Sequence, residues 1–182
     1  MKETLDAIIP FIYLCRCCYH RNSKNILPKN IMEKSNDIKM LTPHFSKWEM
    51  KRSGIAIRHN IANEPNEEQW KNLYNLCSNI LEPLRLRFGA ITITSGFRCK
   101  QLNDMVHGAI NSQHCRGEAA DIYIGSAEKA TKYFQFIRQH TDFDQLIAEP
   151  AGRRIAEARW IHVSFTTRRP NRHQIIVRTD QA

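Results

Sequence analysis

Two polar segments that lie far apart in the chain place the strongest constraint on its fold. Residues 112–121 have the sequence SQHCRGEAAD and contain His114 and Asp121, while residues 160–164 have the sequence WIHVS and contain His162. Together the two segments supply two imidazoles and one carboxylate, which are side chains that bind metal ions. A fold that uses all three side chains must bring the two segments close together.

The local sequence around these residues can aim their side chains at one point. Residues 119–124 and 160–165 are typical of short strands, in which successive side chains alternate between two faces. In the second strand the apolar residues occupy one face, and His162 lies on the other. Asp121 lies at the beginning of the first strand after a glycine turn, and His114 lies in the loop ahead of it.

The three side chains match a zinc site that has one open position. Catalytic zinc usually takes three protein ligands and keeps the fourth position for water, whose pKa the metal lowers toward ~7. We therefore predict that His114, Asp121 and His162 hold a catalytic Zn2+. The spacing of the first histidine and the aspartate alone also fits an ordinary surface histidine, and the third ligand is what favours the metal.

A third segment, residues 94–98, has the sequence TSGFR and adds an arginine. Residues 90–94 alternate as in a strand, the next two residues form a turn, and Arg98 opens a helix-like segment. An arginine at such a turn can project toward a site at the strand ends, where its rigid fork of donors suits a carboxylate or an oxyanion. The alternative is a solvated surface arginine.

Taken in order, the motifs Ser-Gly-Phe-Arg, Ser-x-His-x-x-Gly-x-Ala-x-Asp and Trp-x-His-x-Ser resemble the signature of a known family. It comprises the zinc D-Ala-D-Ala carboxypeptidases and related peptidoglycan peptidases, which share a fold with the hedgehog signalling domain. The likeness runs from about residue 40 to about residue 165 and looks closest to the small phage-type and prophage-type members. The resemblance implies that His114, Asp121 and His162 are the zinc ligands and that Arg98 holds the substrate carbonyl or carboxylate.

Amide hydrolysis also needs a general base, which is usually a carboxylate. Many members of the family carry an acid three residues before the last histidine, and Arg159 occupies that position here. Glu149 ends an apolar run that we expect to pair antiparallel with residues 160–165, so that it can reach the metal-bound water. Glu157, in the polar loop 152–159, is the alternative to the favoured Glu149. If both carboxylates only pair with nearby arginines, the protein binds metal with impaired chemistry.

The rest of the chain predicts helices packed against a small sheet. One helix begins near residues 63–65 and ends at Gly89 with an apolar stripe at helical spacing, and another begins at Ser126. Residues 173–178 form a predicted last strand. These elements predict an α+β domain in which helices pack against one small antiparallel sheet, as in the hedgehog/DD-peptidase fold.

Length and composition predict one folded domain preceded by an extension. A chain of 182 residues fits a single domain. We assign residues 40–182 to the zinc peptidase domain and residues 1–39 to a poorly ordered N-terminal extension. The apolar run 8–15 is too short to span a membrane and lacks a signal-peptide cleavage pattern. A membrane-contacting patch, or translation upstream of a true start at Met40, is the alternative for the extension.

The net charge indicates which partners to expect, and the cysteine content indicates the state of the thiols. Most of the net charge of +9 lies on residues 40–182 and favours polyanions such as cell wall or nucleic acid. The basic run 168–173 lacks the interleaved aromatic residues of a single-strand platform, so we expect a solvated loop and no nucleic-acid partner. Six cysteines without a Cys-x-x-Cys pair predict free thiols, with Cys115, next to His114, as an alternative ligand or nucleophile.

The sequence thus predicts a zinc metallopeptidase that hydrolyses peptide bonds of peptidoglycan stem peptides, as a D-Ala-D-Ala carboxypeptidase or an endolysin-like endopeptidase. We expect a monomer without a transmembrane segment, made in the cytoplasm and acting on the cell wall or periplasm by an unknown export route. Two other classes stay open. One is a non-catalytic zinc-binding or wall-binding module on the same fold, which Arg159 permits, and the other is a basic nucleic-acid binder.

Overall fold

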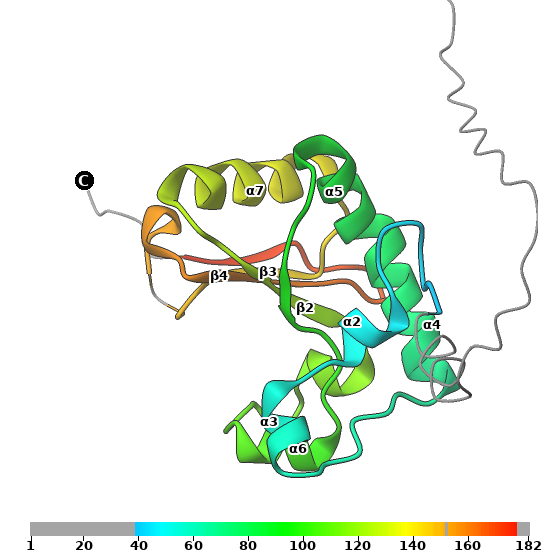
Figure 1. The fold of residues 1–182 in the computed structure, drawn as a ribbon. Coiled ribbons are helices and arrows are strands. Elements are labelled where there is room, and N and C mark those ends of the chain that lie inside the picture. The colour runs from blue at the N-terminus through cyan, green and yellow to red at the C-terminus, as the bar shows by residue number, and fades with distance from the viewer. Residues whose placement is uncertain (1–38, 152, 178–182) are drawn as a thin grey trace, which may run out of the picture.

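The computed structural model describes residues 39–151 and 153–177, and a five-stranded sheet lies at its centre (Figure 1). The predicted extension, apart from Lys39, lies outside the described residues. The strand order is β1-β2-β4-β3-β5. In chain order the strands are β1 (Ile93–Ser95), β2 (Ala119–Tyr123), β3 (Gln145–Glu149), β4 (Trp160–Ser164) and β5 (Gln174–Ile176).

The sheet is mixed, which corrects the prediction of a wholly antiparallel sheet. Strands β1, β2, β4 and β3 pair antiparallel with their neighbours, whereas β5 pairs parallel with β3. Strand β4 lies in the middle, and both of its edges are occupied by β2 and β3. The last strand therefore pairs at the free edge of β3, where the direction of the chain makes it parallel. The predicted α+β class is confirmed.

Helices cover one face of the sheet. The predicted long helix is present as α4 (Glu67–Leu76), a π-helical segment (Cys77–Leu81) and α5 (Glu82–Phe88), and the second is α7 (Ala127–His140). Asn66 caps the first helix through a capping box, Ser126 caps α7, and Gly89 ends α5 with a left-handed φ of 78°. The π-helical segment precedes Pro83, which has no N–H to continue an α-helical ladder.

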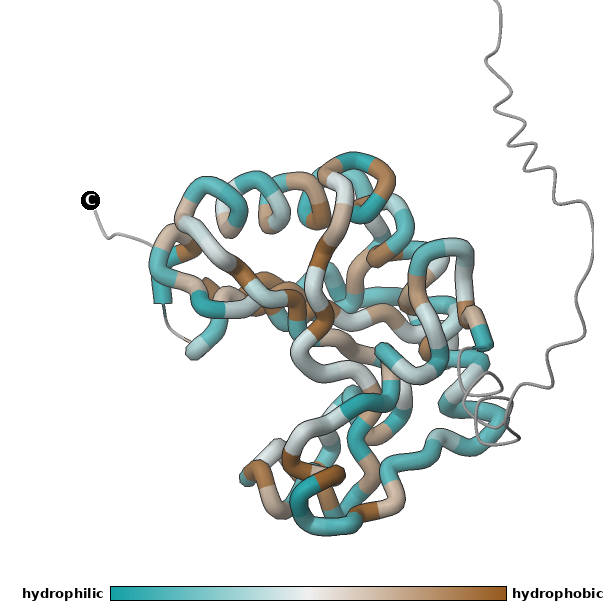
Figure 2. The backbone as a smooth tube through the Cα atoms, in the orientation of Figure 1, coloured by the Kyte–Doolittle hydropathy of each residue, from teal (hydrophilic) through white to brown (hydrophobic). Residues whose placement is uncertain are grey.

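Alternation along the strands separates a core face from an open face. Core side chains from the three central strands are fully buried among the helices, and burial of each isoleucine, leucine or valine stabilises the fold by about 1.5–3 kcal/mol. Apolar colour marks these strands in Figure 2, and along α7 it alternates with polar colour turn by turn. The central strands contribute the buried residues Ile122, Leu146, Ala148, Ile161 and Val163 to this core.

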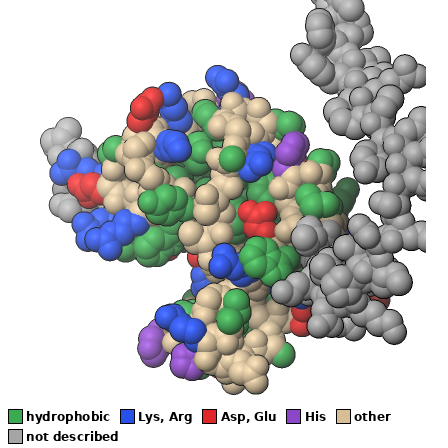
Figure 3. All heavy atoms as spheres, viewed as in Figure 1, with side chains coloured by type: hydrophobic (Ala, Val, Ile, Leu, Met, Phe, Trp, Pro, Cys, Tyr) green, Lys and Arg blue, Asp and Glu red, His purple; other side chains and the backbone are tan. Residues whose placement is uncertain are grey.

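A smaller lobe faces the open side of the sheet. It contains α3 (Gly54–Arg58), α6 (Lys100–Met105) and a 3₁₀ turn (Gln113–Arg116), with its own small apolar cluster around Leu102. Helix α2 (Lys47–Lys51) instead packs its buried Met50 into the main core. A cleft of about 930 Å³ lies between this lobe and the sheet, and Figure 3 shows the hollow. None of the described helices is long and apolar enough to cross a bilayer.

Candidate metal centre

Two neighbouring strands and one turn carry the three predicted ligands. Asp121 is the middle residue of β2 and His162 is the middle residue of β4, and the two are direct partners in the register. His114 lies in the 3₁₀ turn, which ends at Gly117 with a left-handed φ of 71°. A Cβ atom at that glycine would lie 2.5 Å from the carbonyl oxygen of Gln69, so only glycine fits the turn. The structure therefore brings the three side chains together on the open face of the sheet.

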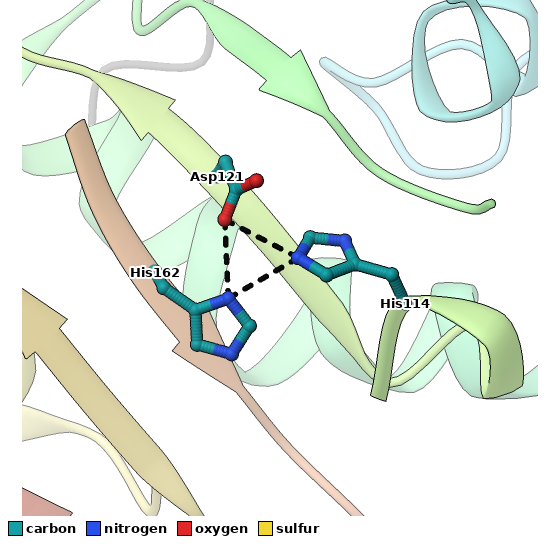
Figure 4. A group of neighbouring side chains, drawn as sticks. All are labelled: His114, Asp121 and His162. Carbon is teal, nitrogen blue, oxygen red and sulfur yellow. Dashed lines mark hydrogen bonds and ion pairs between the residues drawn. The ribbon is translucent and has the colours of Figure 1, made fainter. Parts of the chain in front are cut away.

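The three ligand atoms form a nearly equilateral triangle (Figure 4). His114 Nε2 lies 3.2 Å from both Asp121 Oδ1 and His162 Nδ1, and the latter two atoms are 3.1 Å apart. A tetrahedral ion with ligand bonds of about 2.0–2.1 Å holds its ligand atoms about 3.3–3.4 Å apart. The triangle is thus close to the size that a zinc ion requires. All three residues are buried.

The protonation of His114 favours a cation at the centre of this triangle. Its Nδ1 lies 2.7 Å from the carbonyl oxygen of Gly96, which can only accept a hydrogen bond, so Nδ1 carries the hydrogen. Burial lowers the pKa of His114 more strongly than neighbouring Asp121 raises it, so the ring is neutral and Nε2 presents a lone pair. The three atoms can supply at most one hydrogen of their own, from His162 Nδ1, and Nη2 of Arg98 approaches His114 Nε2 only at a long 3.4 Å. A metal ion satisfies all three, and the Gly96 contact is the outer support common for metal-binding histidines.

Asp121 is held as an anion at this position. Burial favours its neutral acid, yet the pKa of Asp121 lies well below its usual range, and the permanent cation of Arg98 beside it stabilises the charged form. Its second oxygen, Oδ2, accepts a hydrogen bond of 2.6 Å from Nη2 of Arg98. Oδ1 is therefore left facing the two imidazoles.

Arg98 lies at the strand-to-helix turn where the sequence places it. It follows β1 and precedes α6, which begins at Lys100, and it lines the cleft beside the two histidines. Its Nε donates to Ser95 Oγ at 2.7 Å, so Ser95 and Asp121 together fix the guanidinium. Its role as a substrate clamp stays a prediction.

Of the two candidate bases, Glu149 lines the cleft. It ends β3 on the face that carries His162, but the register pairs it with Trp160, and Ile147 lies opposite His162. Glu149 is therefore a diagonal neighbour of the histidine, about 7–8 Å away between backbone positions, and not the direct neighbour that we expected.

Glu157 lies elsewhere. It belongs to a 3₁₀ turn (Ile155–Glu157) that packs against α7, the helix on the core face, and its Oε1 lies 3.6 Å from Arg154 Nε. The geometry favours Glu149 as the base, and that role stays a prediction.

The alternative role for Cys115 finds no geometric support. Within residues 39–151 and 153–177, the group that could hold a metal ion consists of the two histidines and Asp121 alone. Burial also raises the pKa of the Cys115 thiol, which disfavours the thiolate that a ligand or nucleophile must present.

Sequence reasoning missed part of the cleft wall. Gln113, Arg169 and Arg172 line the cleft, and all three contact the buried Asp144. The basic run 168–173 is therefore anchored to the fold, where a solvated loop was expected. No local pattern in the sequence links these residues to Asp144, because the four residues come from three separate segments.

Comparison with known proteins agrees with this geometry. The sequence model of the peptidase M15 family matches residues 43–164, which is more than half of the chain and includes all three ligand positions. No curated protein matches the chain. Peptidases of this family are zinc-dependent, in agreement with the two imidazoles and one carboxylate of the site. The chain therefore belongs to the peptidase M15 family, a family of metallopeptidases.

Proposed function

We propose that the protein is a zinc-dependent peptidase that hydrolyses peptide bonds in the stem peptides or cross-links of bacterial peptidoglycan. One observation carries the proposal: three buried acceptor atoms converge to within 3.2 Å of one another on the wall of an open cleft. Family membership supports metallopeptidase chemistry. The proposal covers both a carboxypeptidase that removes a terminal D-Ala and an endopeptidase.

His114, Asp121 and His162 hold the metal ion in this proposal. Zinc at such a site supplies an activated water at neutral pH and polarises the scissile carbonyl. The protein's own contribution is to keep the ligands deprotonated and oriented. Burial keeps His114 neutral, the Gly96 carbonyl fixes its tautomer, and Arg98 turns the carboxylate of Asp121 toward the imidazoles.

Glu149 acts first as the general base and then as the general acid. It takes a proton from the attacking water and delivers it to the leaving nitrogen, as a carboxylate at a peptidase site does. Its position on the same sheet face as His162, one diagonal step away, supports this role because a glutamate side chain can span that separation with one intervening water.

Arg98 serves as the electrophilic clamp. Its Nε and Nη2 are engaged by Ser95 and Asp121, which hold the guanidinium plane in one orientation at the cleft wall. A guanidinium has five N–H donors, so further donors can receive the substrate carbonyl or carboxylate.

Arg159 favours one competing function, a non-catalytic zinc-binding or wall-binding module on the same fold. This exposed arginine stands where many related enzymes carry an acid, three residues before His162. Its backbone is fixed between two strands, because its N–H donates to Glu149 and its carbonyl accepts from Ile124. A local shift of the chain therefore cannot bring another acid into that place.

A hydrolysis assay with the purified full-length protein and isolated muropeptides distinguishes the two functions. The zinc peptidase predicts hydrolysis that stops when a chelator removes the metal and returns when zinc is added. Binding to peptidoglycan without any cleavage, at full zinc occupancy, would favour the module and overturn the proposed activity.

A further inference from the structure

The connection between β4 and β5 brings two arginines into the cleft. Arg169 and Arg172 both line the cleft, although they lie beyond residue 164, where the family match ends. Their side chains are 37% and 46% exposed, so both remain partly accessible to solvent in the cleft.

A fully buried carboxylate holds both arginines. Asp144, just before β3, accepts hydrogen bonds from two nitrogens of Arg169 at 2.6 and 3.1 Å and from two side-chain nitrogens of Arg172 at 2.8 and 3.1 Å. The backbone N–H of Arg172 and the amide of Gln113 complete its contacts, at 3.0 and 2.8 Å. Two permanent cations thus share one anion, and the cluster carries an excess positive charge at the cleft wall.

The arginine-bearing connection is also fixed along its length. Asn171 Oδ1 accepts from the backbone N–H of Thr166, and Asn171 Nδ2 donates to Asp142. Arg168 forms a two-bond ion pair with the buried Glu118, at 2.6 and 2.9 Å. A connection held at both ends loses little conformational entropy when a ligand binds, so the two cations are prepared for an anion.

The cluster lies at a defined distance from the metal centre. Along β3, Asp144 precedes Ile147, the partner of His162, by three residues, which corresponds to about 10 Å of strand. The same separation spans about three residues of an extended peptide. Gln113 couples the two places directly, because it contacts Asp144 and is the residue before His114.

We propose that Arg169 and Arg172 form a carboxylate-binding subsite that recognises a free carboxylate of the substrate peptide two to three residues from the scissile bond. The inference rests on the proposed function for the identity of the substrate. Nη1 of Arg169 also donates to the carbonyl oxygen of Pro170 at 3.1 Å. The N–H groups of the two guanidinium groups that contact neither Asp144 nor Pro170 bind this carboxylate. Peptidoglycan stem peptides carry such carboxylates, and some bear amides in their place.

The test uses a synthetic stem peptide with free carboxylates and the same peptide with those carboxylates amidated. In R169Q and R172Q, the KM for the free-carboxylate peptide rises about tenfold or more, while kcat and the zinc content stay unchanged. The amidated peptide shows no such change. R138Q, an exposed arginine of α7 on the core face, serves as the matched control and behaves as the wild type.

Two further measurements keep the test independent of folding and of hydrolysis. R169K and R172K keep the charge beside Asp144 but lose the fork, and they weaken binding of the free-carboxylate peptide by a similar factor. Calorimetric binding of both peptides needs no cleavage, so a protein that binds the free form selectively but cleaves neither keeps the subsite and loses the proposed activity. Equal affinity of wild type for the two peptides, or unchanged KM and affinity in all four variants, would overturn the subsite.

Discussion

Asp121 and Asp144 are two buried aspartates beside the same cleft, yet their surroundings differ in kind. Both have a pKa held below the usual range against the effect of burial. Asp144 is surrounded by hydrogen-bond donors alone: two guanidinium groups, one backbone N–H and one amide. On its Oδ1 side, Asp121 faces two imidazole nitrogens, of which one has no hydrogen to give.

The partners of the two aspartates distinguish a structural carboxylate from a metal ligand. At Asp144 the protein supplies every hydrogen and more positive charge than the carboxylate needs, so the cluster is complete by itself. At Asp121 three acceptor atoms converge with at most one hydrogen of their own and one long contact of 3.4 Å from Arg98 to His114, and a cation completes the arrangement. Burial and a lowered pKa are common to both aspartates, and only the chemistry of their partners separates them.

Substitution of each aspartate by asparagine should separate the two sites most strongly in the rate of muropeptide hydrolysis. Asp121→Asn should reduce muropeptide hydrolysis to the background rate, because a neutral amide is a poor zinc ligand. Asp144→Asn should keep kcat/KM within about tenfold, with the loss confined to KM, since it only loosens the two arginines. Steady-state kinetics with both variants checks this; equal losses of kcat would show that the two aspartates do not differ in role.

The second largest effect concerns the proton. Glu149→Gln should keep zinc and substrate affinity but lower kcat by about 10²–10⁴, the usual contribution of a positioned acid or base. Glu157→Gln is the matched control and should change kcat little, because its carboxylate lies in a surface turn beside Arg154. Turnover of a purified muropeptide decides the matter, and a large loss in Glu157→Gln with a normal Glu149→Gln would reverse the assignment.

Asp144→Asn should lower the stability of the fold, although we expect it to leave kcat unchanged. Asp144→Asn removes the anion shared by Arg169 and Arg172 and should lower the free energy of unfolding at pH 7 by about 1–3 kcal/mol, the range for hydrogen bonds to charged groups. The exposure of both arginines keeps the loss toward the lower end. Urea unfolding measures it, and an unchanged midpoint would mean that the cluster does not stabilise the fold.

The smallest predicted effect is a pH dependence of that stabilisation. Burial raises the pKa of Asp144, but hydrogen bonds from Arg172 and Arg169 outweigh it and hold the pKa below its unfolded value of about 3.9. The carboxylate therefore stabilises the fold fully above about pH 5, and this contribution declines progressively as the pH falls below about 4 toward the lower pKa of the folded state. The difference in unfolding free energy between wild type and Asp144→Asn should shrink from pH 7 to pH 3, and a constant difference would contradict the ion-pair account.

The sequence predicts the Asp121 region far better than the Asp144 region, and the reason is locality. His114 and Asp121 lie in one short segment, and alternation within a strand is enough to place His162 on the same face. The helix that Ser126 caps, the end of the other at Gly89, and the pairing of β3 with β4 also follow from local patterns. These features agree with the structure.

Features that depend on contacts between distant segments could not be predicted from the sequence. The parallel pairing of β5 follows from which strand edges are free, and the register that sets Glu149 opposite Trp160 depends on the hairpin as a whole. The contacts of Asp144 join a turn, a strand end and a later connection. Such a cluster leaves no spacing signal, so its arginines look like an ordinary basic run.

The zinc content of the purified protein is the most direct measure of the metal centre formed by His114, Asp121 and His162. Elemental analysis of purified wild-type protein and of Asp144→Asn should give about one zinc per chain, because three ligands and one open position make a single site. His114→Ala, Asp121→Asn and His162→Ala should each abolish stoichiometric zinc while circular dichroism shows that the secondary structure mostly survives. Full zinc retention in His162→Ala would contradict the account of the metal centre.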